Sequence, residues 1–463
     1  MKRPTAPKPN AKPRAVRARP ASAGPTASAA EAAAKITPAR AAAFEILTLV
    51  GDNKGHSDEL LHSARTEALS PEDRNLTTAL VMGVLRWQIS LDARLSKLLA
   101  RPDQRLAEPV ALALRMGAFQ LLHMDRIPAH AVLNESVELC RAAGQPHAAG
   151  MVNAILRKLS AAQKPGTRIF ESPAAFAERL GHPLWLVERW VNIYGRDSAL
   201  AICEYDQREP HSGALFPAPT TTEPQPSAAH PTHSAPQMDD GSRLVAELAA
   251  AALPSTAHQP RVWDCCAAPG GKTLMLALRL PTADILATDA SAKRLAHTTA
   301  RLRRYAYANH VRTAVTDAAQ ATEPVTHFDL ILCDVPCSGT GTLARNPEIR
   351  HRLRPEEFTR QSSRQRDILL GAARRLAPGG RIVYSTCSLE PEENERIIDA
   401  IASEAGLRIL SIEPPLRHLV ATGMLSPTAG AALLPSAITG NALRTIPGIH
   451  PCDGFFATIL ERN

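Results

Sequence analysis

The sequence predicts a multidomain protein in which an all-α N-terminal domain precedes an open α/β domain. Three observations support this prediction. Apolar residues recur at helical spacing from residue 36 to 160, a proline-rich stretch occupies residues 210–238, and short apolar runs alternate with helical stretches over residues 239–463. A chain of 463 residues is also too long for one ordinary hydrophobic core.

Residues 1–35 are expected to form a disordered basic tail. They hold eight Lys and Arg residues, six prolines and the single acid Glu31, so they supply +7 of the formal charge of +8. The remainder of the chain is therefore nearly neutral. Three roles stay open for the tail: a solubilising extension, an arm that attracts phosphate groups, or an organelle transit peptide.

Residues 36–160 are predicted to form the helical domain, because stripes such as Phe44, Leu47 and Val50 repeat with a period near 3.6. Ser70 before a proline and two acids is typical of a helix start. We expect residues 161–209 to form a helical connector. Residues 210–238, with seven prolines and one charged residue, are expected to form a flexible linker.

The composition argues against membrane, disulfide and metal classes. No apolar run approaches the ~18 residues that a membrane span needs. The eight cysteines form neither a disulfide framework nor the paired ligand knuckles of a zinc site. The sequence therefore predicts a soluble protein of the reducing cytoplasm, with no membrane partner and no bound metal.

Four apolar runs after the linker are predicted as parallel strands, at residues 261–264, 285–288, 329–333 and 381–384. Helical stretches lie between them, as in a doubly wound sheet. In such a sheet the carboxyl ends of adjacent strands face one crevice, where ligands bind. Candidate functional residues are therefore sought directly after each strand.

A glycine-rich turn follows the first of these strands and opens a helix, which places backbone N–H groups at the crevice. Asp289 ends the second strand, about 18 residues after the turn, where a carboxylate can accept hydrogen bonds from both ribose hydroxyls. Asp317 is a candidate contact to adenine, or else a solvated loop acid. The turn, predicted to hold an adenosyl cofactor, consists of Cys266, Ala267, Ala268, Pro269, Gly270, Gly271 and Lys272.

An ATP-binding P-loop is the competing interpretation of this turn, because Gly271, Lys272 and Thr273 resemble its last three residues. The P-loop spacing requires a glycine at position 266, where this chain has Cys266. The mismatch favours a site for an adenosyl cofactor over the ATP-binding site of a nucleoside triphosphatase.

Two further strand ends carry Asp334 with Cys337, and Cys387. We expect these three side chains to converge beside the cofactor. A thiolate that adds to carbon 6 of cytosine makes carbon 5 nucleophilic enough to accept a methyl group, and Lys272 is a candidate for the positive charge that favours a thiolate. The alternative is that the cysteines are small buried hydrophobes, which is the simplest view of Cys265 and Cys333.

Seven arginines lie between Arg345 and Arg366, against three glutamates. We expect a track for an RNA backbone close to the crevice, and the alternative is a solvated helix face.

Four stretches resemble the Sun/Nol1/Nop2 family of RNA cytosine-5 methyltransferases, within a match that covers nearly all of residues 239–463. They are residues 266–272, 334–340, 345–350 and 384–390. The resemblance implies a Rossmann-like methyltransferase domain that uses S-adenosyl-L-methionine. It also implies that Cys387 is the nucleophile, that Cys337 assists breakdown of the covalent adduct, and that Asp334 lies where the cytosine meets the cofactor. Asp289 and Asp317 match the ribose and adenine contacts.

Residues 36–160 resemble the NusB-like RNA-binding domain of one bacterial branch of that family, through Gly83–Trp87, Arg126–His130, Asn134–Glu135 and Val152–Arg157. This domain pair implies 16S rRNA as the substrate, with no DNA partner, and we expect a monomer. Two departures stand out. The chain passes from Arg208–Pro210 into the linker, where the family usually has a small mixed α/β RNA-binding subdomain, and Cys452 stands in a motif that usually has a histidine.

Three alternatives stay open. A non-catalytic RNA-binding assembly factor would share the fold, but the presence of Lys272, Asp289, Asp334, Cys337 and Cys387 argues against it. A methyltransferase that acts on another RNA, such as tRNA, would share the chemistry. A DNA cytosine-5 methyltransferase would use Cys337 as its nucleophile, and the Ser-Thr-Cys387 element and the helical domain argue against that enzyme.

Overall fold

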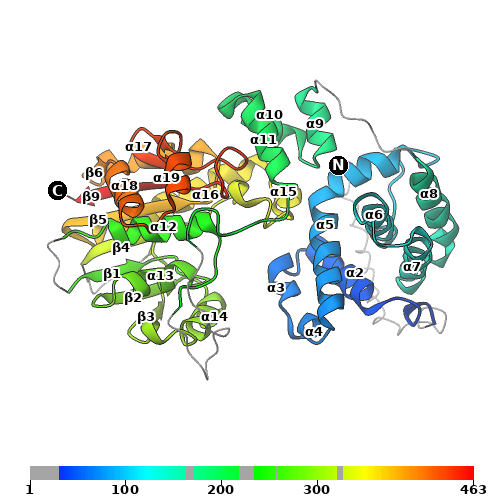
Figure 1. Ribbon diagram of the computed structural model, residues 1–463, viewed down its shortest axis with the longest axis horizontal. Helices are drawn as coiled ribbons and strands as arrows, with labels where there is room; N and C mark the ends of the chain where they lie inside the picture. The colour runs from blue at the N-terminus through cyan, green and yellow to red at the C-terminus, as the bar shows by residue number, and fades with distance from the viewer. Residues whose placement is uncertain (1–30, 163–170, 218–233, 256–258, 321–326, 463) are drawn as a thin grey trace, which may run out of the picture.

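The computed structural model describes residues 31–162, 171–217, 234–255, 259–320 and 327–462. Residues 1–30 of the predicted tail and residues 218–233 of the predicted linker lie outside these ranges. Figure 1 shows a helical domain beside an α/β domain, with a group of short helices above their junction. Within the described ranges, no helix combines the length and the apolar character that crossing a bilayer requires.

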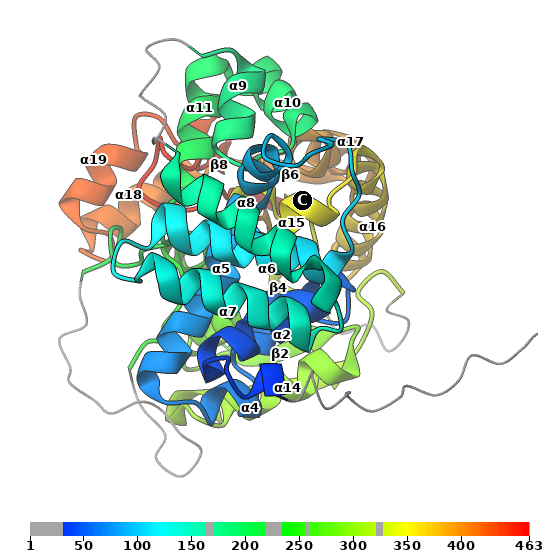
Figure 2. The same cartoon turned by 90° about the vertical axis from the view of Figure 1, so that its right-hand side faces the viewer.

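The helical domain is a bundle around one apolar core, and Figure 2 looks onto its helices α6, α7 and α8. Ser70 caps α5, since its hydroxyl accepts a hydrogen bond from the Asp73 N–H at 3.1 Å, so the predicted helix start is confirmed. Gly83 allows α5 and α6 to approach, because a Cβ there would lie 2.0 Å from the Phe119 ring. The elements are α2 (Pro38–Gly51), α3 (Ser57–Leu61), α4 (Ala64–Glu67), α5 (Pro71–Ser96), α6 (Glu108–His123), α7 (Ala129–Ala142), η1 (Pro146–Ala148) and α8 (Ala149–Ala161).

Three connector helices follow: α9 (Pro173–Arg179), α10 (Leu184–Tyr194) and α11 (Arg196–Tyr205). They share an apolar cluster with Leu343, Phe358 and Leu389 of the α/β domain. The connector is therefore packed onto the α/β domain. Between α11 and the next helix, the described residues 206–217 and 234–239 form no strand, so the small mixed α/β subdomain of the family has no counterpart there.

The α/β domain contains one mixed sheet with strand order β3-β2-β1-β4-β5-β9-β8-β7, and β6 pairs with β9. The first five strands are parallel and β9 runs antiparallel to β5. All four predicted strands are confirmed, and the chain reverses its winding direction between β1 and β4, which places the ligand crevice there. The strands are β1 (Arg261–Asp264), β2 (Asp284–Asp289), β3 (Arg312–Val315), β4 (Phe328–Asp334), β5 (Leu376–Thr386), β6 (Leu407–Leu410), β7 (Ile438–Thr439), β8 (Ala442–Arg444) and β9 (Phe456–Arg462).

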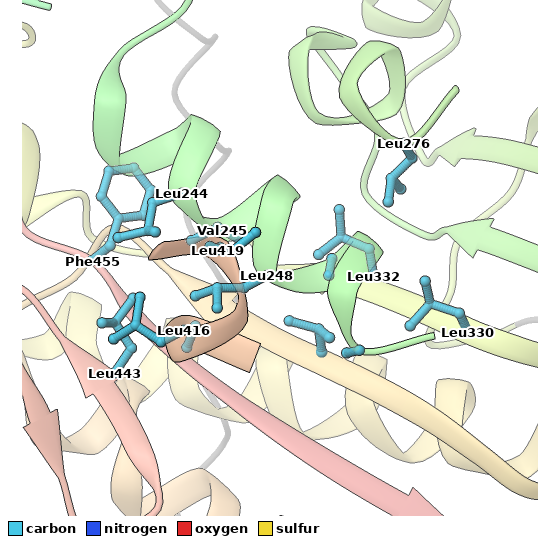
Figure 3. Packing of buried hydrophobic residues seen from close by; sticks show 14 of the residues in the cluster. Leu244, Val245, Leu248, Leu276, Leu330, Leu332, Leu416, Leu419, Leu443 and Phe455 are labelled. Atoms are coloured by element: carbon cyan, nitrogen blue, oxygen red, sulfur yellow. The ribbon is translucent and has the colours of Figure 1, made fainter. Parts of the chain in front are cut away.

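Helices cover both faces of this sheet because successive strand residues point to opposite sides. Leu330 and Leu332 of β4 belong to the apolar cluster that α12, α13 and α18 share, part of which Figure 3 shows, whereas Ile331 belongs to the cluster of α16 and α17. The remaining elements are α12 (Asp240–Ala251), α13 (Gly271–Arg279), α14 (Ala292–Leu302), η2 (Ala306–Ala308), η3 (Thr340–Thr342), α15 (Ile349–Arg352), α16 (Pro355–Arg374), η4 (Pro391–Glu393), α17 (Glu395–Glu404), α18 (Glu413–Ala421) and α19 (Pro427–Leu433).

The two domains meet through hydrogen bonds from α15. Arg350 is 1% exposed and donates to the carbonyl oxygens of Arg86 and Gly181, each at 3.1 Å. Arg352 donates to two further carbonyls of the helical domain, and His351 lies 2.7 Å from the Leu85 carbonyl oxygen. These side chains fix the domain junction, so the prediction that they belong to an RNA track is wrong for Arg350 and Arg352.

Candidate active site

The glycine-rich turn lies where β1 ends and α13 begins. Gly270 has φ +91°, a left-handed conformation that favours glycine, and a Cβ there would lie 2.9 Å from the Thr298 methyl group. The Ala267 N–H donates to the Thr288 carbonyl at 2.8 Å, which ties the turn to the end of β2. The turn therefore holds the N-terminus of α13 at the carboxyl edge of the sheet, as the sequence predicts.

Two adjoining cavities of about 370 Å³ and 270 Å³ occupy this edge and share Cys266, Ala268 and Asp334. The larger cavity is lined by the glycine-rich turn, including Lys272, and the smaller cavity by the predicted residues that follow the other strands. Every predicted site residue except Gly270 lines one of the two. The smaller cavity brings together Asp289, Asp317, Asp334, Cys337 and Cys387.

Asp264, at the end of β1, lines the larger cavity and is a residue that the sequence analysis did not select. Its Oδ2 accepts a hydrogen bond from the Thr273 hydroxyl at 2.6 Å, whereas its buried Oδ1 has no partner among the described residues. Burial raises the pKa of Asp264 to about 7. An unpaired acceptor beside a glycine turn fits the amino group of a methionine moiety, so these residues suit S-adenosylmethionine. The sequence could have pointed to Asp264 by its position as the last residue of the first strand.

Asp289 and Asp317 hold their carboxylates in place through local backbone bonds. Asp289 is 5% exposed, accepts from the Ser291 N–H at 2.8 Å and pairs with Arg294 at 3.1 Å. Asp317 follows β3 and accepts from the Ala319 N–H at 3.1 Å. Both carboxylates line the same cavity, where an adenosine would meet them.

Lys272 and Asp334 form an ion pair at 2.7 Å on the wall between the cavities. The Ser385 hydroxyl donates to the other Asp334 oxygen at 2.8 Å. Burial lowers the pKa of Lys272, but the charge of Asp334 and its hydrogen bond outweigh this and raise that pKa. Lys272 therefore stays an ammonium ion.

Cys337 and Cys387 lie with their sulfur atoms 3.3 Å apart, and both are free thiols. They come from the loops that follow β4 and β5. The hydrogen bond to Cys387 raises the pKa of Cys337, and burial raises it further. Cys337 is accordingly a protonated thiol that can donate to the Cys387 sulfur.

Glu393, in η4, connects these two cysteine loops and was also missed by the sequence analysis. Its fully buried carboxylate accepts from the Ser338 N–H at 2.9 Å, from the Gln365 amide at 3.1 Å, and from the hydroxyls of Ser338 and Ser388. Ser338 and Ser388 each follow a cysteine directly. Burial raises the pKa of Glu393, against the effect of the bonds donated by Ser338 and Ser388.

The other cations of the predicted RNA track are mostly paired within the protein. Arg345 binds Asp453 at 2.5 Å and lines the larger cavity, and Arg360 and Arg366 pair with Glu357 and Glu404. Arg364 lines the smaller cavity.

Cys265 and Cys333 are buried, in agreement with their interpretation as small hydrophobes, and so are Cys140, Cys203 and Cys452. Over the described residues, no group of three or more His, Cys, Asp or Glu side chains is arranged to hold a metal ion.

The fold and the site together define the class of nucleoside-cofactor-dependent methyltransferases, with an adenosyl cavity at the crossover of a doubly wound sheet. Comparison with known proteins narrows this class. The sequence profile of the 16S rRNA methyltransferase RsmB/F matches residues 251–461, and that of the NusB family matches residues 37–161.

The chain is 32% identical to ribosomal RNA small subunit methyltransferase B of Xanthomonas campestris, over 93% of this chain and 99% of the relative. It is 30% identical to the probable enzyme of the same name from Synechocystis, over 92% and 99%. The chain therefore belongs to the ribosomal RNA small subunit methyltransferase B family and is an RNA methyltransferase. The crystal structure of PH0851, at 22% identity and a TM-score of 0.68 over 92% of this chain and 99% of that one, shows the same fold.

Proposed function

We propose that the protein transfers the methyl group of S-adenosylmethionine to carbon 5 of a cytosine in 16S rRNA, with Cys387 as the nucleophile. One observation carries this proposal. Two thiols from adjacent strand ends lie 3.3 Å apart in the cavity that also holds Asp289 and Asp317. Many methyltransferases have an adenosyl cavity, but only a poorly nucleophilic target atom requires a thiol beside it.

Carbon 5 of cytosine requires activation before it can accept a methyl group. The Cys387 thiolate adds to carbon 6, the ring electrons shift toward carbon 5, and an enamine results. Lys272, on the wall between the two cavities, supplies a positive charge that acts on Cys387, and the Cys337 thiol can donate to the Cys387 sulfur. S-adenosylmethionine, when bound, supplies an electrophilic methyl group to carbon 5.

Release of the methylated product requires the bond between the Cys387 sulfur and carbon 6 to break. The proton at carbon 5 leaves to a base, its bonding electrons restore the carbon 5–carbon 6 double bond, and the carbon–sulfur pair returns to Cys387. Cys337 lies at contact distance from the departing sulfur, so we assign it to this step. Asp334, held by Lys272 and Ser385, presents its carboxylate where both cavities meet, and we assign it to the contact between cytosine and cofactor.

The choice of 16S rRNA rests on the names of the relatives and on the NusB match over residues 37–161. We take the helical domain as the RNA-binding module, residues 239–463 as the catalytic domain, and the protein as a monomer. We also propose a cytoplasmic location, because the ribosomal RNA of the named relatives is assembled into ribosomes in that compartment.

The roles of the two cysteines can be separated on a denaturing gel, because a covalent protein–RNA complex survives denaturation and migrates slowly. With transcribed 16S rRNA and S-adenosylmethionine, Cys337→Ala should give a shifted band and no turnover. Cys387→Ala should give neither an adduct nor methylation. Cys203→Ala, a buried cysteine of the connector, is the control and should behave as the wild type.

The opposite band pattern would make Cys337 the nucleophile. An inactive wild type with no adduct in any variant would instead favour the non-catalytic assembly factor. Methylation of tRNA in preference to 16S rRNA would support the proposed reaction but contradict the proposal that 16S rRNA is the substrate.

A further inference from the structure

Helix α14 and the segment after it carry a strong positive charge beside the cofactor turn. Residues 290–316 contain six Lys and Arg residues and no Asp or Glu. Lys293, His297 and Arg301 follow one another at four-residue spacing and so share one face of the helix. We call the surface formed by Lys293, Arg294, His297, Arg301, Arg303 and Arg304 the α14 basic surface.

Contacts place this surface at the catalytic edge. Arg301 donates to the Pro269 carbonyl at 3.3 Å and lines the larger cavity together with Lys272. Arg294 donates to the Ala268 carbonyl at 3.2 Å. The α14 basic surface therefore adjoins the cofactor turn at the edge of the sheet where the two cavities lie.

Several of these charges remain available to an external partner. Lys293, Arg294, His297, Arg303 and Arg304 are all exposed. Arg303 and Arg304 have no ion-pair partner within the described ranges, in contrast to Arg345, Arg360 and Arg366. Lys293 and Arg294 do have internal partners, Glu59 and Asp289, but both side chains are more than half exposed and can still meet an external anion.

The helical domain faces this surface with carboxylates. Glu59 of α3 pairs with Lys293 at 2.8 Å, although the two side chains are 56% and 72% exposed, and Asp58 lines the larger cavity. The hydrogen bond and charge of Lys293 lower the pKa of Glu59, and the charge of His297 contributes. An exposed pair of this kind contributes at most about 1 kcal/mol, so a phosphate group can displace it.

We propose that the α14 basic surface binds the phosphate backbone of the RNA next to the target nucleotide, and that Glu59 occupies part of this surface in the RNA-free protein. The inference rests on the proposed function, since RNA is the substrate there. Phosphates fit because they offer several anionic oxygens to dispersed Lys and Arg side chains, without requiring a particular base.

The test measures equilibrium binding of transcribed 16S rRNA at several salt concentrations. Each phosphate contact on single-stranded RNA contributes about 0.7 to the slope of log affinity against log salt. Lys293→Gln/Arg304→Gln should lower the slope by about 1.4, which corresponds to roughly tenfold weaker binding near 0.15 M salt. Glu59→Gln should act in the opposite direction and strengthen binding, because it frees Lys293.

Arg261→Gln/Arg374→Gln is the matched control, because it also removes two exposed cations, at the amino-terminal edge of the sheet. It should leave the slope unchanged. Calorimetric titration with S-adenosylmethionine checks that every variant is folded. The proposal is overturned if the α14 variant keeps the wild-type slope, if the control loses as much, or if Glu59→Gln weakens binding. A wild type that neither binds nor methylates RNA would reject the proposed function itself.

Discussion

Glu393→Gln tests whether the reactive geometry depends on the carboxylate that joins the two cysteine loops. Glu393 accepts four hydrogen bonds, three of them from Ser338 and Ser388, which directly follow Cys337 and Cys387. Glutamine has nearly the same shape but only one acceptor oxygen. That oxygen can keep the Ser338 N–H and the Gln365 amide, whereas the two hydroxyls must reverse to accept from the new amino group.

The cost follows from these contacts. Two charge-assisted bonds, each worth about 1.5–3 kcal/mol, become neutral bonds worth about 1 kcal/mol, so we expect a stability loss of about 1–4 kcal/mol. For a domain of this size that is a fall in Tm of several degrees, about 2–4 °C for each kcal/mol. The truncation Glu393→Ala would remove all four bonds and leave the buried Ser338 N–H without its acceptor, so it should cost more stability than Glu393→Gln.

The rate of adduct formation should fall as well. A displacement of about 1 Å at reacting atoms can cost roughly 10²-fold in rate. Single-turnover adduct formation by Glu393→Gln should therefore be ten- to a hundredfold slower. The dissociation constant for S-adenosylmethionine should stay within about twofold, because no contact of Asp289 or Asp317 involves Glu393.

Glu392→Gln is the matched control, since it removes the same charge one residue earlier, from a side chain that pairs with Arg189 and Arg396 on the outside of the loop. It should form the adduct at the wild-type rate. A wild-type rate for Glu393→Gln would refute the positioning role. Equal losses in both variants would show that net charge, rather than the bonds to the cysteine loops, sets the rate.

Two further predictions concern the cofactor and the domain junction. Asp289→Ala should weaken S-adenosylmethionine about tenfold or more in a calorimetric titration, because the ribose hydroxyls lose a charge-assisted acceptor worth ~1.5–3 kcal/mol, and an unchanged dissociation constant would remove Asp289 from the site. His351 has its pKa lowered to about 4 by burial and by the charges of Arg350, Arg115 and His182, against the bond to Leu85. In the unfolded chain the histidine pKa is near 6.5, so as the pH falls the unfolded chain takes up this proton before the folded protein does. The contribution of neutral His351 to the free energy of unfolding is therefore complete above about pH 6.5 and is about 1–2 kcal/mol smaller at pH 5. Chemical denaturation of His351→Gln, which keeps the donor to Leu85 but does not titrate, should lack this part of the pH dependence, and parallel curves for both proteins would contradict the assignment.

The fold was largely predictable because its signals are local. Ser70 caps its helix through a residue three positions away, and the strands of the parallel sheet are marked by short apolar runs. The positions of Asp289, Asp334 and Cys387 also followed from one rule, that side chains after parallel strands meet at one edge. Their chemical roles remain proposals, because geometry brings them together without showing the reaction.

Glu393 and Asp264 were missed because their importance depends on distant partners. Glu393 matters through Ser338, which lies 55 residues earlier in the chain. Asp264 matters through an oxygen that lacks a partner, and a sequence does not show which acceptors stay unpaired. Position after a strand or in a turn identifies candidates, but burial and hydrogen bonding decide which of them can orient a reactive group.

The arginines of residues 345–366 also depend on partners that the sequence does not reveal. A guanidinium group has five N–H donors and binds carbonyl oxygens as well as phosphates. The number of arginines in a segment therefore does not reveal which partner each of them binds. Arg350 satisfies carbonyls of residues 86 and 181, which are 264 and 169 positions away. A count of charges along the sequence therefore overestimates the RNA-binding capacity of residues 345–366. The relevant quantity is the charge that remains after internal partners are subtracted, and on the α14 basic surface that leaves Arg303 and Arg304, together with Lys293 and Arg294, whose side chains stay more than half exposed in their ion pairs.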